Sequence, residues 1–201
     1  DAIANADILC TGDAQNTLVG TSYKALLVAE SSTPTLANSR YACTTQACTV
    51  GESYNWVLQS NLRYSSLTNY NQIIGMTNAS SIFPSGADIN KIFVDSAKYI
   101  WTGLATIDAT SQAQGYYNWM TTYPGFTDGP QISPITPTTR GNCNNWTSNT
   151  AYDNLHPDFL AAGNSGRGNQ SGYNAFALSS QGCNDNGNKH YLLCVQQPSA
   201  D

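Results

Sequence analysis

Charged side chains are scarce in this chain. Asp, Glu, Lys and Arg make up 10% of the 201 residues, against about 25% in an average soluble domain. Thirteen acidic and 8 basic residues leave a net charge of −5. Nucleic-acid binding requires a dense cationic surface that releases counterions, and a polybasic membrane anchor requires a similar cluster. We therefore expect no nucleic-acid partner and no such anchor.

Long apolar runs are missing as well. No stretch approaches the roughly 18 apolar residues that suggest a membrane-spanning helix, so the sequence predicts no membrane insertion. The hydrophobic share of 40% and the aromatic share of 10% exclude a disordered chain, and the length suits a single domain over residues 1–201. The chain opens at Asp1 without an apolar leader, and we expect a mature or trimmed form.

Neutral polar residues and cysteines take the place of charge. There are 21 asparagines, and the six cysteines include no Cys-x-x-Cys pair, which favours disulfides over a zinc site. Fifteen pairings are possible. Cys43 and Cys48 are close enough to clip one small loop, and the other four can then nest as Cys10 with Cys194 and Cys143 with Cys183. Such a framework indicates an oxidised, extracytoplasmic protein.

The periodicity predicts an α+β fold with long loops. We expect a helix over 2–16, strands at 23–28, 91–94, 99–104 and 191–195, short extended pieces at 73–75 and 81–84, and surface strands at 142–147 and 172–178. Residues 105–140 show no periodicity and contain four prolines. We read them as a long loop insertion, and such loops are often functional.

Aromatic residues gather in that insertion: Tyr116, Tyr117, Trp119, Tyr123 and Phe126. Flat rings beside asparagines suit sugars, because the ring covers C–H groups while amides bind hydroxyls, and the same rings are enriched in protein interfaces. Alternatively, they pack their own loop onto the core. Trp101 and Trp146, in contrast, are expected in the core.

Catalytic signatures are missing. The chain has no nucleophile elbow, zinc-protease motif or phosphate loop. Its two histidines, His156 and His190, are the only plausible general bases, and His156 lies two residues before Asp158. We expect a protein that is not an enzyme, with a secreted hydrolase using His156 as the alternative.

Metal binding has only weak candidates. Asp185 lies in an Asn-Asp-Asn-Gly-Asn segment that offers oxygen ligands but one carboxylate, whereas calcium sites collect several. This composition suits a turn better. A second cluster is formed by Asp153, Asn154 and Asp158. We expect no cofactor, with calcium as the weak alternative.

Several segments together resemble a known family. They are ANADILC at 4–10, YKALL at 23–27, ACTTQAC at 42–48, WVL at 56–58, IFP at 82–84, WTGL at 101–104, NCNNWT at 142–147 and LLCVQQ at 192–197. In this order they resemble the secreted bacterial domains that include the leptospiral endostatin-like proteins, which are related to endostatin and the C-type-lectin-like fold.

The resemblance implies a small mixed sheet with one or two helices, termini close together and the nested pairs Cys10–Cys194 and Cys143–Cys183. Family members are secreted or surface proteins, and several are proposed to bind host matrix or complement-regulating proteins. The calcium-binding lectin triplets and the histidine cluster of endostatin are missing here, so those metal sites do not carry over. The family's strand before the first helix is expected to be removed or absent.

These observations predict a secreted or surface-attached bacterial domain that binds rather than catalyses. The expected ligands are host surface proteins, extracellular-matrix proteins or neutral glycans, contacted by the loops at 105–140 and 150–175. A structural module of a larger surface assembly is a further alternative.

Overall fold

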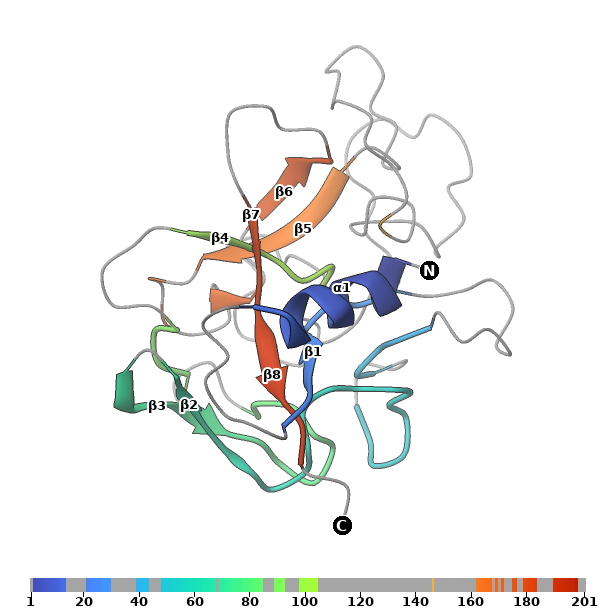
Figure 1. Cartoon of the computed structure of the whole chain (residues 1–201). Coiled ribbons are helices and arrows are strands. Elements are labelled where there is room, and N and C mark those ends of the chain that lie inside the picture. The colour runs from blue at the N-terminus through green and yellow to red at the C-terminus, as the bar shows by residue number, and fades with distance from the viewer. Residues whose placement is uncertain are drawn as a thin grey trace.

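The computed structural model describes residues 2–13, 21–29, 39–43, 48–67, 69–84, 89–92, 98–104, 146, 162–167, 169, 171, 175–176, 179–183 and 190–198. The elements in chain order are α1 (Ala2–Thr11), β1 (Tyr23–Ala25), β2 (Arg63–Ser66), β3 (Asn69–Met76), β4 (Tyr99–Trp101), β5 (Ala162–Arg167), β6 (Ser179–Gly182), β7 (His190–Leu192) and β8 (Cys194–Gln196) (Figure 1). The strands form the pairs β1–β8 and β2–β3 and a four-stranded sheet in the order β6-β5-β4-β7. The predicted α+β class, with one helix and small sheets, is confirmed.

The C-terminal segment joins two of these sheets. β7 runs parallel to β4, which is antiparallel to β5, so the four-stranded sheet is mixed. One residue later, β8 pairs antiparallel with β1. Between them the carbonyl of Leu193 accepts a hydrogen bond of 2.8 Å from the amide of Leu26. β7 and β8 therefore follow one another along a single line past α1 (Figure 1), and the predicted strand at 191–195 is two strands with a break.

The segment that contains β1 is apolar on both faces. Leu26 and Val28 enter the main core, whereas Ala25, Leu27 and Ala29 join a second apolar cluster with α1. Alternation of this kind is typical of an extended segment buried on both sides. The predicted strand at 23–28 is confirmed only as far as Ala25. Beyond it, the hydrogen-bond partners change to residues outside β8.

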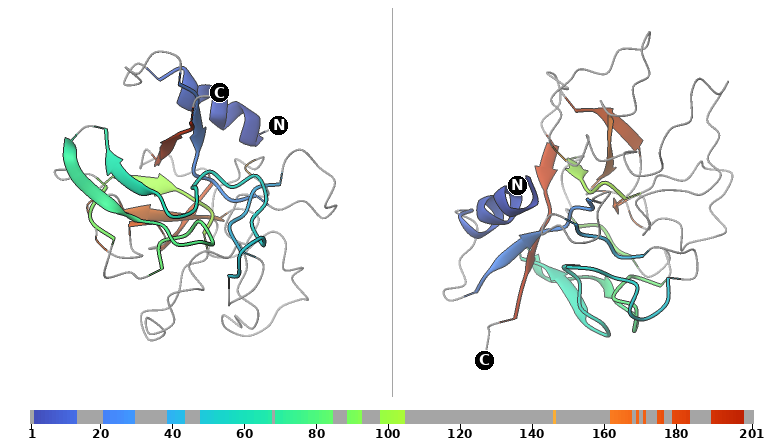
Figure 2. Two further views of the ribbon diagram at one scale, coloured as in Figure 1. Left: turned by 90° about the horizontal axis from the view of Figure 1, so that it is seen from below. Right: turned by 90° about the vertical axis from the view of Figure 1, so that its right-hand side faces the viewer.

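Helix α1 covers the β1–β8 pair with Ile3, Ala6 and Cys10, all buried. In both views of Figure 2 the β1–β8 pair lies between α1 and the β2–β3 hairpin. The prediction that the helix reaches residue 16 is wrong, because α1 ends at Thr11. Gly12 follows, and glycine both favours helix ends and disfavours helix interiors.

Disulfides close the framework as predicted at two places. Cys10 pairs with Cys194, with Cα atoms 5.4 Å apart, and Cys43 pairs with Cys48 at 5.0 Å. The first bridge spans a sequence separation of 184, and loop entropy assigns such a bridge about 5 kcal/mol. Cys183 is also disulfide-bonded, while its predicted partner Cys143 lies outside the described residues.

The predicted surface strand at 172–178 is wrong where the structure describes it. Ala175 and Phe176 lie outside any strand and are buried, and the Phe176 ring stacks on Phe83 with centroids 5.6 Å apart. β5 approaches this segment so closely that a Cβ atom on Gly166 would collide with the Ala175 backbone. The hydroxyl of Thr102 donates to the Phe176 carbonyl at 2.6 Å. The close approach of the backbones at positions 166 and 175 therefore explains why residue 166 is a glycine.

Other strand predictions are corrected as well. The predicted strand 99–104 is confirmed only as β4, and the piece at 73–75 belongs to the longer β3. Lys91 and Ile92, the described part of the predicted strand 91–94, belong to no strand, and neither do residues 81–84. Of 142–147, only Trp146 is described, with a φ of +63°.

An ion pair between Arg40 and Asp7 connects α1 and β1 to the segment that contains Arg40. Arg40 is 1% exposed, and its two terminal nitrogens donate to the two carboxylate oxygens of Asp7 at 2.8 and 2.7 Å. Arg40 also donates to the Ala25 carbonyl at 2.8 Å, and Asp7 accepts from the Ala25 amide at 2.9 Å. Two charges from distant segments thus satisfy each other and the backbone at the end of β1.

Replacing Arg40 by Met should lower the free energy of unfolding by about 3–5 kcal/mol, because it leaves the Asp7 carboxylate without its cation in a mostly buried position. Adding Asp7→Asn should recover part of this loss, since the amide oxygen still accepts from Ala25 without carrying charge. Urea unfolding measures both, with exposed Arg63→Met as the control. A double variant no more stable than Arg40→Met alone would contradict this role of the charge.

Tyr64 should make the stability of the fold decrease at alkaline pH. Burial raises the pKa of its phenol above the ordinary value of 10.0, and the hydrogen bond from the Gln59 amide opposes that shift. The unfolded chain therefore releases this proton first, so stability should fall as the pH rises from 10 toward the folded-state pKa. Tyr64→Phe should make the decline less steep in urea unfolding between pH 9 and 11, whereas exposed Tyr54→Phe should leave it unchanged. Equal slopes in all three proteins would refute the prediction.

Candidate functional site

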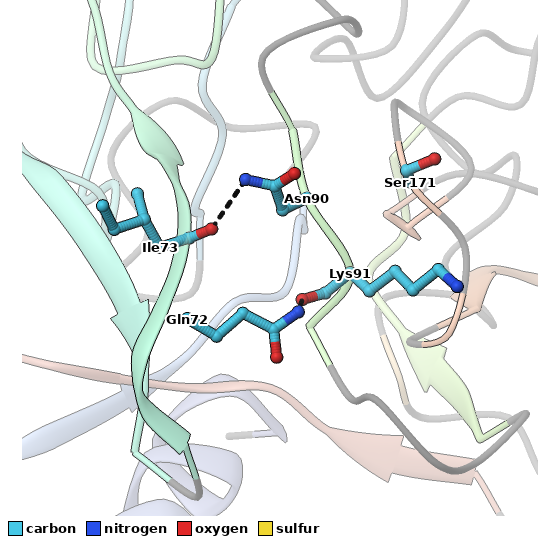
Figure 3. Close-up of a pocket in the computed structure, with 5 residues that line it drawn as sticks. All are labelled: Gln72, Ile73, Asn90, Lys91 and Ser171. Carbon is cyan, nitrogen blue, oxygen red and sulfur yellow. Dashed lines mark hydrogen bonds between the residues drawn. The ribbon is translucent and has the colours of Figure 1, made fainter.

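A polar hollow lies between β3, the segment 89–92 and Ser171. It is open to solvent, has a volume of about 570 Å³ and is lined by Gln72, Ile73, Asn90, Lys91 and Ser171 (Figure 3). Binding sites for small ligands commonly measure about 300–1,000 Å³. The hollow is therefore large enough for a ligand of one or two sugar rings.

Three hydrogen bonds hold the wall formed by 89–92 against β3. The Asn90 amide donates to the Ile74 carbonyl at 2.7 Å. The side-chain NH₂ of Asn90 donates to the Ile73 carbonyl at 2.9 Å, and that of Gln72 donates to the Lys91 carbonyl at 2.8 Å. Both side-chain bonds are drawn in Figure 3. Buried Ile89 and Ile92 flank this wall and anchor it in the core.

These bonds decide which polar groups are left for a ligand. A carbonyl can only accept, so the amide nitrogens of Gln72 and Asn90 must face the backbone, and their oxygens remain as acceptors. The Gln72 Oε1 is buried and accepts no hydrogen bond. Lys91 and Ser171 add an exposed ammonium group and an exposed hydroxyl. The lining thus offers an acceptor at exposed Asn90 and a cationic donor at Lys91, while the Gln72 oxygen is closed off in the wall.

Ile73 adds an apolar surface to the hollow. Successive side chains of a strand face opposite sides, so Ile74 enters the core while Ile73 is 43% exposed. The register passes from Tyr64↔Gly75 to Ser65↔Ile73, so the hairpin has a bulge at Ile74, which has no opposite residue.

A second cluster consists of rings on the four-stranded sheet. Tyr99, Arg167 and His190 are register neighbours on β4, β5 and β7. The Arg167 guanidinium lies 5.1 Å from the Tyr99 ring centroid, and His190 stacks on Trp101 at 4.0 Å. Trp146 meets Trp101 edge-on at 5.7 Å. The tryptophans pack against the cluster under α1 and are partly buried, so the expectation of core positions holds in part.

The residues predicted as ligand contacts lie outside the described residues. This applies to Tyr116, Tyr117, Trp119, Tyr123 and Phe126, and to the acidic or catalytic candidates Asp153, Asn154, His156, Asp158 and Asp185. The described residues include no cluster of three or more His, Cys, Asp or Glu side chains that suits a metal ion. Within the same residues, no helix is long and apolar enough to cross a membrane.

The family comparison covers α1 and β1 to β4 and ends before β5. A family model described as "Protein of unknown function (DUF1554)" matches residues 1–158. The chain belongs to this family. The searches of curated proteins and of solved structures returned no match. The matched span contains four residues of the hollow, and Ser171 lies beyond it.

Sequence reasoning overlooked the hollow. Gln72 and Asn90 are amides in a chain full of amides, and nothing in their spacing sets them apart. Ser171 was covered only as part of the predicted contact loop at 150–175. The one available signal was Ile73 and Ile74 side by side, because adjacent residues of a strand face opposite sides and one of the two isoleucines must then lie on the outer face.

Asn90→Asp should loosen the wall of the hollow, because a carboxylate oxygen facing the Ile73 carbonyl repels it instead of donating to it. We expect a loss of about 1–2 kcal/mol in stability and faster hydrogen exchange of the Asn90 amide. Ser171→Ala is the control and should change stability by less than about 0.5 kcal/mol. Unchanged exchange protection in Asn90→Asp would show that this hydrogen bond does not hold the wall.

Proposed function

We propose that this chain is a secreted or surface-attached bacterial domain that binds host glycans or matrix proteins without catalysing a reaction. The hollow beside β3 favours the glycan ligands, and its pattern of hydrogen-bond groups is the observation that carries the proposal. The disulfides are compatible with a protein outside the cytoplasm.

The finer fold assignment is part of the same proposal. We propose a C-type-lectin-like or endostatin-like fold, in which a disulfide and a strand pair join the two ends of the domain. The Cys10–Cys194 bridge and the β1–β8 pairing support this arrangement, as does the mixed sheet around β4. The loops at 105–140 and 150–175 are proposed to add contacts, and Ser171 belongs to the second.

Sugars fit the lining of the hollow group by group. Sugar hydroxyls donate to an exposed oxygen such as that of Asn90 and accept from Lys91 and Ser171. The C–H groups of a sugar ring pack on an exposed aliphatic side chain such as Ile73.

A glycan array probed with the purified domain tests the proposal, followed by calorimetry with the best hit. Gln72→Leu should weaken binding at least tenfold, because it removes the hydrogen bond that holds the backbone of Lys91 in the wall of the hollow. Exposed Gln196→Leu is the matched control and should bind like wild type, and thermal melting confirms that both variants are folded. No hit on the array at micromolar protein would refute glycan binding, and a hit unaffected by Gln72→Leu would exclude the hollow as its site.

A further inference from the structure

The polar groups of the hollow lie on two sides. On one side, the side-chain NH₂ of Asn90 points to the Ile73 carbonyl, so the Asn90 oxygen is left for a ligand. On the other side lies the ammonium group of Lys91. In Figure 3 the Lys91 side chain extends away from Gln72, toward the side where Ser171 lies. A complementary ligand therefore carries donors at one end and an acceptor, best an anion, at the other.

The Lys91 charge is not neutralised by any described residue. Among the described residues, an ion pair joins Arg40 to Asp7. The contact found there for Lys91 is the hydrogen bond that its backbone carbonyl accepts from Gln72. An ammonium group on a long, flexible stem can reach an anion in several positions. Because the hollow has one cation and the chain a net charge of −5, the structure suits one negative charge and not a polyanion.

We propose that the hollow prefers a sugar that carries a single carboxylate over its neutral counterpart. This inference rests on the proposed function and extends it from neutral glycans to weakly acidic ones. The carboxylate pairs with the Lys91 ammonium group, a ring hydroxyl donates to the oxygen of Asn90, and the C–H face of the ring contacts Ile73. Uronic acids and sialic acids share this chemistry.

Three matched pairs of probes test the preference by calorimetry: methyl glucuronide with methyl glucoside, methyl galacturonide with methyl galactoside, and sialyllactose with lactose. In at least one pair the acidic member should bind about fivefold more tightly, the size expected of an exposed ion pair. The preference should shrink as salt rises from about 20 to 150 mM, because exposed charges are screened. Lys91→Gln should abolish it, because the glutamine side chain carries no charge to pair with the carboxylate.

Arg63→Gln is the matched control. It removes one exposed positive charge from β2, and Arg63 does not line the hollow. This variant should keep the preference. Equal affinity within all three pairs, weakened by Gln72→Leu, would overturn the inference and leave the proposed function standing. A preference that survives Lys91→Gln would also overturn it. If none of the six sugars binds, the inference fails, and the glycan array decides separately whether the proposed function fails with it.

Discussion

The ion pair between Arg40 and Asp7 is the polar contact on which the junction of α1 and β1 depends. The two residues are 33 positions apart, and Arg40 could not remain buried alone, because an isolated charge in a protein interior is strongly destabilising. Together they satisfy the amide and the carbonyl of Ala25. Helix α1 is thus fixed to the end of β1 by polar contacts at one point, while the Cys10 bridge fixes it to β8.

This arrangement separates the parts that stabilise the domain from the part proposed to bind. The ion pair and the long disulfide act at the helix and the β1–β8 pair, on the side away from the β2–β3 hairpin (Figure 2). The hairpin is linked to them through the main core, to which it contributes Ile74 and the partly buried Tyr64. Residues of the hollow can therefore vary, and so change ligand preference, with little effect on the contacts that hold the ends together.

The sequence predicted the framework better than the site. Cysteine spacing and the family resemblance were enough for Cys10–Cys194 and Cys43–Cys48, and apolar content was enough for β1 and β4. The hairpin was mostly missed, because β2 and the first half of β3 consist of Arg, Tyr, Ser, Asn and Gln, where burial depends on partners far away in the chain. Burial of Arg40 was equally invisible, since only the fold brings Asp7 within reach.

The same polar composition explains how a hollow in this domain can distinguish one ligand from another. In a chain with so few charges, recognition depends on which amide groups the fold uses up and which it leaves. Here the backbone carbonyls of Ile73 and Lys91 each accept one N–H of a side-chain amide, so the orientation of both amides is fixed. A net charge of −5 does not attract polyanions, and its field fades within about 8 Å at physiological salt. An anion therefore gains from Lys91 only after the remainder of its structure has fitted the acceptors beside it.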